Sequence, residues 1–505
     1  MTPFRELSGE KTPSPCIFVI FGATGDLTHR KLVPALYNLS REGLLPAHFA
    51  CVGFARRDKS HDQFRKELYQ GVNEFSRSRP TDEDVWHNFA QHLFYHRSEF
   101  DNDEGYERLK TFLSDLDVQF GTQQNRVFYL SVPPSYFPLI VEKLAKHGLI
   151  SPQDTTPFSR VIIEKPFGHD LASALALQKE LTGFLKESQV YRIDHYLGKE
   201  TVQNLLVFRL TNPIFEQLWN RNSIDNVQIT VAEEIGIGTR GKFFEEAGML
   251  RDIVQNHMMQ LLSLVAMEPP SNLSPSSIHN EKNKVLEACR PIPQEEFHRY
   301  VVRGQYGAGL INGETVPGYR EEDNVDPHSN IETYVALKVF IDNWRWSGVP
   351  FYLRAGKRLP KRATEIAITF KEPPGVLFQS SGKSAPNTLV IRIQPDEGIA
   401  LKINCKVPGQ STLIQPVKMD FRYGAFFGAS PPEAYERLIC DCMAGDSTLF
   451  ARIDEVIASW QLLNPVLERW KTEEKSDFPN YSAGTWGPKA AEDILVQEED
   501  VWRLL

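Results

Sequence analysis

Short, continuous apolar runs separated by helical segments occupy the first part of the chain. Each run stops close to a glycine, a proline or a charged residue, and the runs cover residues 16–21, 49–54, 127–132, 161–163 and 190–193. Strands that are apolar at every position are typical of parallel sheets, which are buried on both faces. We therefore predict an α/β domain over residues 1–197, with a Rossmann-like, doubly wound parallel sheet.

After about residue 225 the pattern changes to strict alternation of apolar and polar positions. The alternating segments are residues 227–231, 335–341, 366–370, 389–393 and 401–405. A period of two indicates antiparallel strands with one buried face. Helical spacing at 249–265 and 434–442 interrupts them. We predict an α+β domain over residues 198–505, with a large, mainly antiparallel sheet flanked by helices, for substrate binding and dimerisation.

Length and composition agree with two large folded domains. The chain has 505 residues, 41% of them hydrophobic, and single cores stop growing near about 250–300 residues. Its net charge of -9 disfavours general binding to nucleic acid or to anionic membranes. Six cysteines show no paired framework, and no basic stretch near the start leads into an apolar run. We therefore expect reduced thiols and a cytoplasmic protein.

A glycine-containing turn follows the first apolar run and leads into a helical segment. It consists of Gly22, Ala23, Thr24, Gly25, Asp26 and Leu27. Glycines let the backbone turn tightly and approach a pyrophosphate, and the helix that follows offers N–H groups to that anion. The spacing is shorter than the full G-x-G-x-x-G, so an ordinary strand-to-helix turn is the alternative interpretation.

The second apolar run ends in Arg56-Arg57. NAD-specific sites usually carry a carboxylate there, which accepts the ribose 2′-hydroxyl. Because two cations suit a 2′-phosphate instead, we predict NADP as the cofactor. A solvated pair of surface charges is the alternative interpretation.

Polar residues gather after the last two runs. Lys165 follows residues 161–163, while Asp194, His195 and Tyr196 follow residues 190–193. Lys199 comes four residues after His195, where a helix is expected to begin. Ligands of doubly wound sheets bind outside the carboxyl ends of the strands, so this cluster predicts a phosphate-binding site. A structural turn with an exposed lysine is the alternative.

His257 is the candidate base for removing the proton of a sugar hydroxyl during hydride transfer. It lies at the edge of an apolar stripe in residues 248–265, so periodicity alone favours a packed core histidine. Asp252 and Asn256 on nearby faces favour a wet cleft. A carboxylate such as Asp194 could orient the imidazole. The sequence has neither H-E-x-x-H nor G-x-S-x-G, so we predict no catalytic metal and no serine nucleophile.

Together these segments closely resemble the glucose-6-phosphate dehydrogenase family. The matching pieces are GATGDL (22–27), FARRD (54–58), NRVFYL (125–130), EKPFG (164–168), RIDHYLGKE (192–200), RDIVQNH (251–257), residues 344–359, IRIQP (391–395), EAYERLI (433–439) and GTWGP (484–488). RIDHYLGKE is long and very specific, and the resemblance runs from about Cys16 to the C-terminus.

The resemblance implies NADP-dependent oxidation of D-glucose 6-phosphate to 6-phospho-D-glucono-1,5-lactone, the first step of the oxidative pentose phosphate pathway. It implies His257 as general base with Asp194 as its partner. The cofactor would contact Gly22–Leu27, Arg56, Tyr129 and Lys165. The substrate would contact Lys165, His195, Tyr196, Lys199, Glu233, Asp252, Lys357, Gln394 and either Lys361 or Arg362. A homodimer, or a dimer of dimers, would form through the second domain's sheet.

Two other functions are compatible with parts of this pattern. A second NADP-dependent sugar oxidoreductase, related to glucose–fructose oxidoreductase, would not supply RIDHYLGKE or Lys199. A non-catalytic NADP-sensing regulator would be expected to lose Asp194 or His257, and both are present. The sequence therefore favours the enzyme, with D-glucose 6-phosphate rather than nucleic acid or membrane as its partner.

Overall fold

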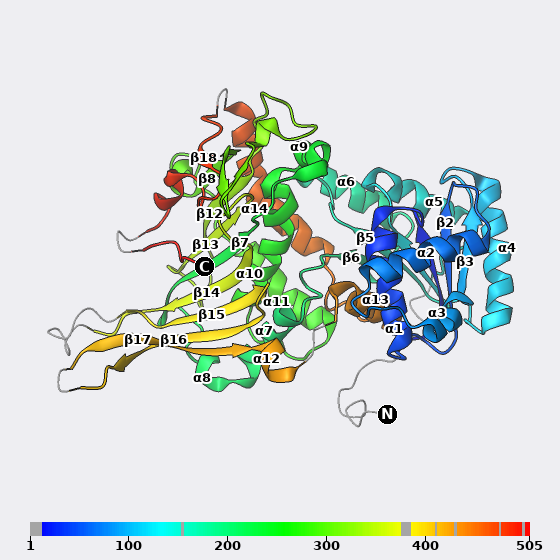
Figure 1. Cartoon of the computed structure of the whole chain (residues 1–505), viewed down its shortest axis with the longest axis horizontal. Helices are drawn as coiled ribbons and strands as arrows, with labels where there is room; N and C mark the ends of the chain where they lie inside the picture. Colours follow the sequence, from blue (N-terminus) through cyan, green and yellow to red (C-terminus); the bar gives the residue numbers. More distant parts are fainter. Residues whose placement is uncertain are drawn as a thin grey trace. The chain divides into compact units, whose positions relative to one another are not determined.

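The computed structural model describes residues 13–152, 156–374, 385–409, 412–428, 432–473, 476–496 and 500–505. The chain divides into two compact units. One unit contains the residues up to Gly198 together with 273–279 and 432–453. The other contains Lys199–Asn272, Asn280–Pro431 and Asp454–Leu505. Both units therefore combine segments that are far apart in the sequence (Figure 1).

A six-stranded, fully parallel sheet forms the centre of the first unit. In spatial order its strands are β3 (Leu93–Arg97), β2 (Phe49–Ala55), β1 (Cys16–Phe21), β4 (Arg126–Leu130), β5 (Ser159–Glu164) and β6 (Val190–Ile193). The predicted doubly wound parallel sheet is confirmed. The edge strand β3 was not predicted, because its five residues LFYHR mix apolar and charged side chains.

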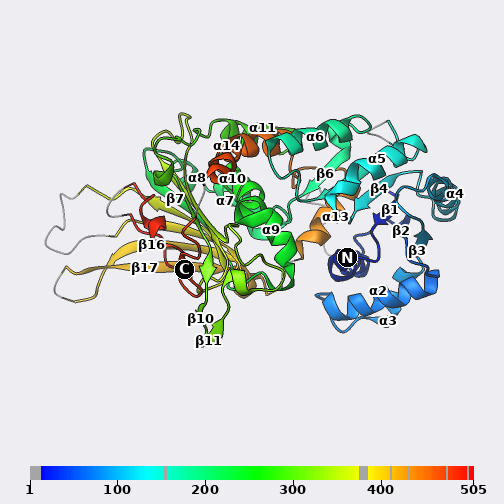
Figure 2. The ribbon, with the colours of Figure 1, turned by 90° about the horizontal axis from the view of Figure 1, so that it is seen from above.

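Helices cover both faces of this sheet. They are α1 (Val33–Arg41), α2 (His61–Phe75), α3 (Glu83–Ala90), α4 (Asp103–Phe120), α5 (Phe137–Lys146), α6 (Leu171–Thr182) and α13 (Ala434–Ala444), with the short segments η2 (Thr28–Leu32), η3 (Pro134–Tyr136) and η4 (Glu187–Gln189). Figure 2 shows α2 and α3 on one side of the strands and α5 and α6 on the other. α13 packs against α1, and its Leu438 and Ile439 belong to the core around β1.

An eight-stranded sheet forms the centre of the second unit. In spatial order its strands are β17 (Ile414–Arg422), β16 (Gly398–Lys406), β15 (Thr388–Gln394), β14 (Ala363–Phe370), β7 (Ile224–Ala232), β13 (Pro350–Gly356), β12 (Tyr334–Phe340) and β8 (Val301–Gly304). β7 and β13 run parallel, and every other neighbouring pair described is antiparallel. The predicted large, mainly antiparallel sheet is confirmed. Periodicity missed β13 because it is buried at every position.

Helices and short elements complete the second unit. The helices are α7 (Glu200–Thr211), α8 (Pro213–Glu216), α9 (Gly241–Met249), the π-helical η6 (Leu250–Met258), α10 (Met259–Ala266), α12 (Tyr423–Phe427), α11 (Pro275–Glu287) and α14 (Ile453–Thr472), the last two of which begin in the first unit. The short elements are η5 (Gly238–Arg240), η7 (Phe297–Arg299), η8 (Tyr319–Glu321), η10 (Lys489–Glu492), β9 (Tyr306–Gly307), β10 (Gly309–Ile311), β11 (Glu314–Val316) and β18 (Tyr481–Ser482). η6 packs on β7 and β13, and α7 packs on β15.

Within the described ranges, no helix combines the length and apolar character that a membrane span requires. All six cysteines lie in described residues and none forms a disulfide. Burial raises the pKa of Cys16 to about 12 and also raises the pKa of Cys51 and Cys442. These three thiols are therefore inert packing groups.

Candidate active site

The turn after β1 has a backbone that requires glycine at its first position. Gly22 has a φ of 80°, and a Cβ there would lie 2.1 Å from the Ser131 carbonyl oxygen. The Gly25 N–H donates to Gly22 O at 2.9 Å, which closes the turn, and the Gly22 N–H donates to Phe54 O of β2. No side chain in the described part of the chain caps the π-helical η2 that follows Leu27. This helix start is a suitable place for an anion.

The predicted residues of the first unit lie at, or just after, the carboxyl ends of adjacent strands. Across the sheet the order is Arg56 after β2, Gly22–Leu27 after β1, Tyr129 in β4, Lys165 after β5 and Asp194 after β6. Four strand intervals separate β2 from β6, which is roughly 19 Å. The order of connections reverses between β1 and β4, the position at which doubly wound sheets bind dinucleotides. The structure thus brings these residues to one edge of the sheet.

Arg56 is exposed immediately after β2. The backbone around it is fixed by Tyr95 of β3, whose hydroxyl donates to Arg57 O at 2.6 Å and also lies 3.2 Å from Ala55 O. The guanidinium therefore extends from a fixed backbone next to the glycine turn, where a phosphate on the ribose could reach it.

A carboxyl group that was not among the predicted site residues lies directly before Lys165. Glu164 ends β5 and accepts hydrogen bonds from the hydroxyls of the fully buried Tyr129 and of Tyr435 in α13, the second at 3.2 Å. Burial raises the pKa of Glu164 to about 7, against the opposing effect of the two hydroxyls and Lys165. A carboxylate as the last residue of a buried strand was the signal that could have revealed it.

The side chain of Asp194 shapes the turn after β6. Its Oδ1 accepts the Tyr196 N–H at 3.0 Å, and its main-chain oxygen accepts the Leu197 N–H at 3.0 Å. Asp194 and Tyr196 are buried, while His195 is half-buried with its ring edge-to-face against Tyr196, 5.2 Å between centroids. The turn thus holds His195 and Tyr196 in a fixed relation to one another.

In the second unit, two predicted residues meet at the end of its parallel strand pair. Ala232 of β7 lies beside Gly356 of β13, so the next residues, Glu233 and Lys357, lie side by side. The Glu233 N–H donates to Gly356 O at 2.9 Å. Lys357 forms an ion pair with Glu233 at 2.5 Å. Strand register therefore brings together two residues that are 124 positions apart.

The same end of this sheet carries four more predicted residues of the second unit. Lys199, at the start of α7, donates to Gln394 Oε1 at the end of β15, and Gln394 Nε2 donates to Thr364 Oγ1 at 3.1 Å. Lys361 and Arg362 precede β14, whose first residue pairs with the last residue of β7. Both are exposed, so the structure does not choose between them.

His257 and Asp252 lie in the π-helical η6 and both are buried. Five residues separate them, which would place them about 140° apart on an α-helix. The i→i+5 hydrogen bonds of a π-helix instead bring such residues to one face. His257 is 1% exposed, as its core-like periodicity predicted, and Asp252 is 7% exposed. Sequence periodicity could not reveal this winding.

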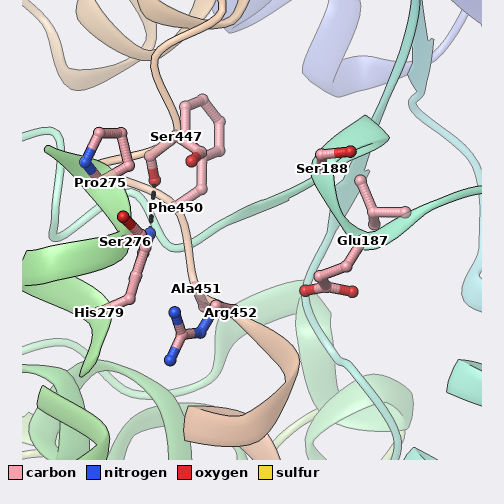
Figure 3. Close-up of a pocket in the computed structure, with 10 residues that line it drawn as sticks. Glu187, Ser188, Pro275, Ser276, His279, Ser447, Phe450, Ala451 and Arg452 are labelled. Atoms are coloured by element: carbon pink, nitrogen blue, oxygen red, sulfur yellow. Dashed lines mark hydrogen bonds between the residues drawn. The ribbon is translucent and has the colours of Figure 1, made fainter. Parts of the chain in front are cut away.

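A pocket of about 350 Å³ lies elsewhere in the first unit (Figure 3). Its lining residues come from η4, the start of β6, the first turns of α11 and the segment before α14; they are Glu187, Ser188, Val190, Pro275, Ser276, His279, Ser447, Phe450, Ala451 and Arg452. Val190 begins β6, whereas Asp194 follows its opposite end. The pocket therefore lies at the amino end of that strand and includes none of the predicted site residues.

A parallel sheet with strand order 3-2-1-4-5-6, a glycine turn after β1 and an attached α+β unit are typical of nicotinamide-dependent oxidoreductases. Comparisons with known proteins are more specific. The family model "Glucose-6-phosphate dehydrogenase, NAD binding domain" matches residues 19–204, and "Glucose-6-phosphate dehydrogenase, C-terminal domain" matches residues 206–503. The chain belongs to the glucose-6-phosphate dehydrogenase family.

Individual relatives match over nearly their full lengths. Glucose-6-phosphate 1-dehydrogenase of Chlamydia pneumoniae is 56% identical over 505 residues, covering 99% of this chain and 98% of the relative. The Bacillus subtilis enzyme is 45% identical over 487 residues, covering 96% and 98%. A solved glucose-6-phosphate dehydrogenase in complex with glucose 6-phosphate has a TM-score of 0.88 and 36% identity, covering 97% of this chain and 100% of that one. These matches favour the enzyme over both rival functions.

Proposed function

We propose that this chain oxidises D-glucose 6-phosphate with NADP+. Hydride passes from C1 of the sugar to the nicotinamide and the C1 hydroxyl loses its proton, giving 6-phospho-D-glucono-1,5-lactone, NADPH and H+. The reaction is the entry step of the oxidative pentose phosphate pathway. The observation that carries the proposal is the solved relative with a TM-score of 0.88, whose complex holds glucose 6-phosphate.

In this proposal His257 removes the hydroxyl proton, and Asp194 orients the imidazole and stabilises its charged form. The burial of His257 in η6 supports the role, because a base shielded from water keeps its proton transfer directed to the substrate. Asp252 on the same π-helical face suits a sugar hydroxyl.

The sugar phosphate is held by His195, Tyr196 and Lys199. Two of these follow β6 and the third immediately precedes α7. The sugar hydroxyls and ring are contacted by Glu233, Asp252, Lys357, Gln394, Lys165 and one of Lys361 and Arg362. The Lys357–Glu233 ion pair supports this assignment because it fixes a donor and an acceptor at one sheet end.

The cofactor is NADP, with its diphosphate at Gly22–Leu27, its 2′-phosphate at Arg56 and its nicotinamide near Tyr129 and Lys165. Replacing Arg56 with alanine should raise the KM for NADP+ at least about tenfold, the loss of one charge-assisted contact, without weakening NAD+ use. Arg108→Ala, an exposed arginine of α4, serves as the control. An equal loss with both cofactors would contradict the 2′-phosphate role.

The experiment that tests the reaction is the appearance of NADPH absorbance with glucose 6-phosphate and NADP+, measured for the native chain and for His257→Asn. The variant should lose about 10²–10⁴-fold in kcat while substrate binding, followed by calorimetry, survives. A native, folded chain that binds cofactor without forming NADPH would contradict the proposed reaction. A variant whose kcat stays within tenfold would reassign the base.

We also propose a homodimer, or a dimer of dimers, that works in the cytoplasm. β17 is the terminal strand of the large sheet, and Met419 on it is 59% exposed, with Phe426 of α12 74% exposed. An exposed apolar sheet edge favours pairing with a second copy. Light scattering should give the mass of a dimer for the native chain. It should give a lower average mass for Met419→Lys, because the new charge weakens dimerisation. Free cysteines fit a reducing compartment.

A further inference from the structure

The π-helical segment that carries His257 begins at a backbone break. Gly248, near the end of α9, has φ 64° and ψ 179°, a region open essentially to glycine alone. A Cβ on Gly248 would lie 2.5 Å from Oε1 of Glu332 and 2.9 Å from its Cδ and Oε2. The carboxyl group of Glu332 therefore lies directly against the bare Cα at which the chain changes direction.

Glu332 binds the first two N–H groups after this break. Its Oε1 accepts the Leu250 N–H at 3.0 Å, and its main-chain oxygen accepts the Met249 N–H at 3.0 Å. The residue is 3% exposed, so these bonds do not compete with water. One residue thus satisfies, with its side chain and its backbone, donors that a helix start leaves without intrahelical partners.

The residue after Glu332 holds the sugar-binding side of the site. Thr333 O accepts the Lys357 N–H at 3.0 Å, and Thr333 Oγ1 lies 3.0 Å from the hydroxyl of Tyr481. That hydroxyl also donates to Lys357 O at 2.8 Å. Two consecutive residues therefore tie the start of η6 to the end of β13, where Lys357 pairs with Glu233.

We infer that Glu332 is a positioning residue for the proposed base His257. Its carboxyl group, seated over Gly248, fixes where the π-helical winding starts and so the direction in which Asp252 and His257 point. The inference rests on the proposed function. The physical reason is that each residue of register in a helix turns the side chains by about 100°. A shift of the start would therefore turn Asp252 and His257 together, away from the direction in which both point in the native fold.

The test compares three substitutions of one residue. Glu332→Gln keeps an acceptor oxygen in nearly the same volume, so its kcat should stay within about threefold of native. Glu332→Asp and Glu332→Ala lose that acceptor, and kcat should fall about 10–100-fold, since a displacement near 1 Å costs about that much. The KM for glucose 6-phosphate should rise in the same two variants, because Asp252 turns together with His257. The acidic limb of the pH profile, which reports the base, should shift in the same two variants.

Glu365→Gln is the matched control, since Glu365 is a buried glutamate of β14 that binds Arg503 rather than η6. It should lower the melting temperature without moving the pH profile. The inference is overturned if Glu332→Gln and Glu332→Ala have the same kcat. It is also overturned if kcat falls only in proportion to the melting temperature, with an unchanged pH profile, as expected for Glu365→Gln. If the Ala and Asp variants do not fold, hydrogen exchange of the native Leu250 amide decides. Slow exchange of this amide supports the positioning role of Glu332, and exchange as fast as that of an exposed amide overturns it.

His257→Asn separates this inference from the proposed function. Unchanged kcat in His257→Asn would remove the base assignment itself, whatever Glu332 does. A collapse in His257→Asn together with native kcat and native pH profile in Glu332→Ala would overturn the positioning role alone.

Discussion

A buried ion pair in the second unit allows a quantitative prediction. Lys282 of α11 lies 2.9 Å from Glu455 of α14, and the two side chains are 1% and 0% exposed. Gln260 of α10 donates to the same carboxylate oxygen at 3.2 Å. Three helices therefore meet on one charged pair that has no access to water.

The expected loss of stability follows from two opposing energies, the attraction between the charges and the cost of removing them from water. At 2.9 Å and an effective dielectric constant near 20, the attraction is about 6 kcal/mol. Removing both charges from water costs several kcal/mol for each ion, so the intact pair is close to neutral overall. Lys282→Met leaves the Glu455 carboxylate buried without its cation, and should lower the free energy of unfolding by about 3–5 kcal/mol. Adding Glu455→Leu should recover most of that loss.

The assay is a double-mutant cycle in which urea unfolding measures the free energy of unfolding of each variant. Hydrogen exchange in α11 and α14 reports on the stability of the second unit. This local readout is needed because a chain of two units does not unfold in one step. Lys284→Met is the control on the same helix, because the Lys284 side chain is 67% exposed in an ion pair with Glu281. This substitution should lower the free energy of unfolding by less than about 1 kcal/mol. A loss below about 1 kcal/mol for Lys282→Met, or a double variant no more stable than the single one, would refute the reasoning.

Two further predictions concern stability. Hydrogen bonds to Asp103 and Glu107 raise the pKa of His147, so its contribution is complete below the unfolded pKa of about 6.5 and is lost as pH rises through the folded value. The free energies of unfolding of the native and His147→Ala chains should differ most at acidic pH. An equal difference at every pH would contradict this prediction. Trp502→Ala should cost about 3–5 kcal/mol, because its ring lies 4.7 Å from the buried Arg354 guanidinium and its N–H donates to a backbone oxygen at 2.7 Å. An unchanged melting temperature would show that Arg354 does not depend on that ring.

Part of the candidate site was predictable because strand ends are encoded locally. A continuous apolar run such as residues 190–193 specifies a buried parallel strand, and its carboxyl end must lie at the ligand-binding edge. Gly22, Arg56, Lys165 and Asp194 were located in this way, and the structure brings them to one sheet edge. Glu164 and Glu332 were missed because a single carboxylate carries no periodic signal. Their significance comes from Tyr129, Tyr435 and Leu250, which they meet only in the folded chain.

The sequence by itself determined the two kinds of sheet, the glycine turn and the family, because each is encoded in residues close together along the chain. Only the tertiary structure decided which surfaces meet. Helix α13 could be predicted from its apolar stripe, but not that Glu436 would bind Asn38, 398 positions away, and join the parallel-sheet unit. The Leu250 N–H at the start of η6 likewise donates to Glu332, 82 positions further along the chain. Local periodicity states that a face is buried, whereas its partner is selected by packing and hydrogen bonding across the whole fold.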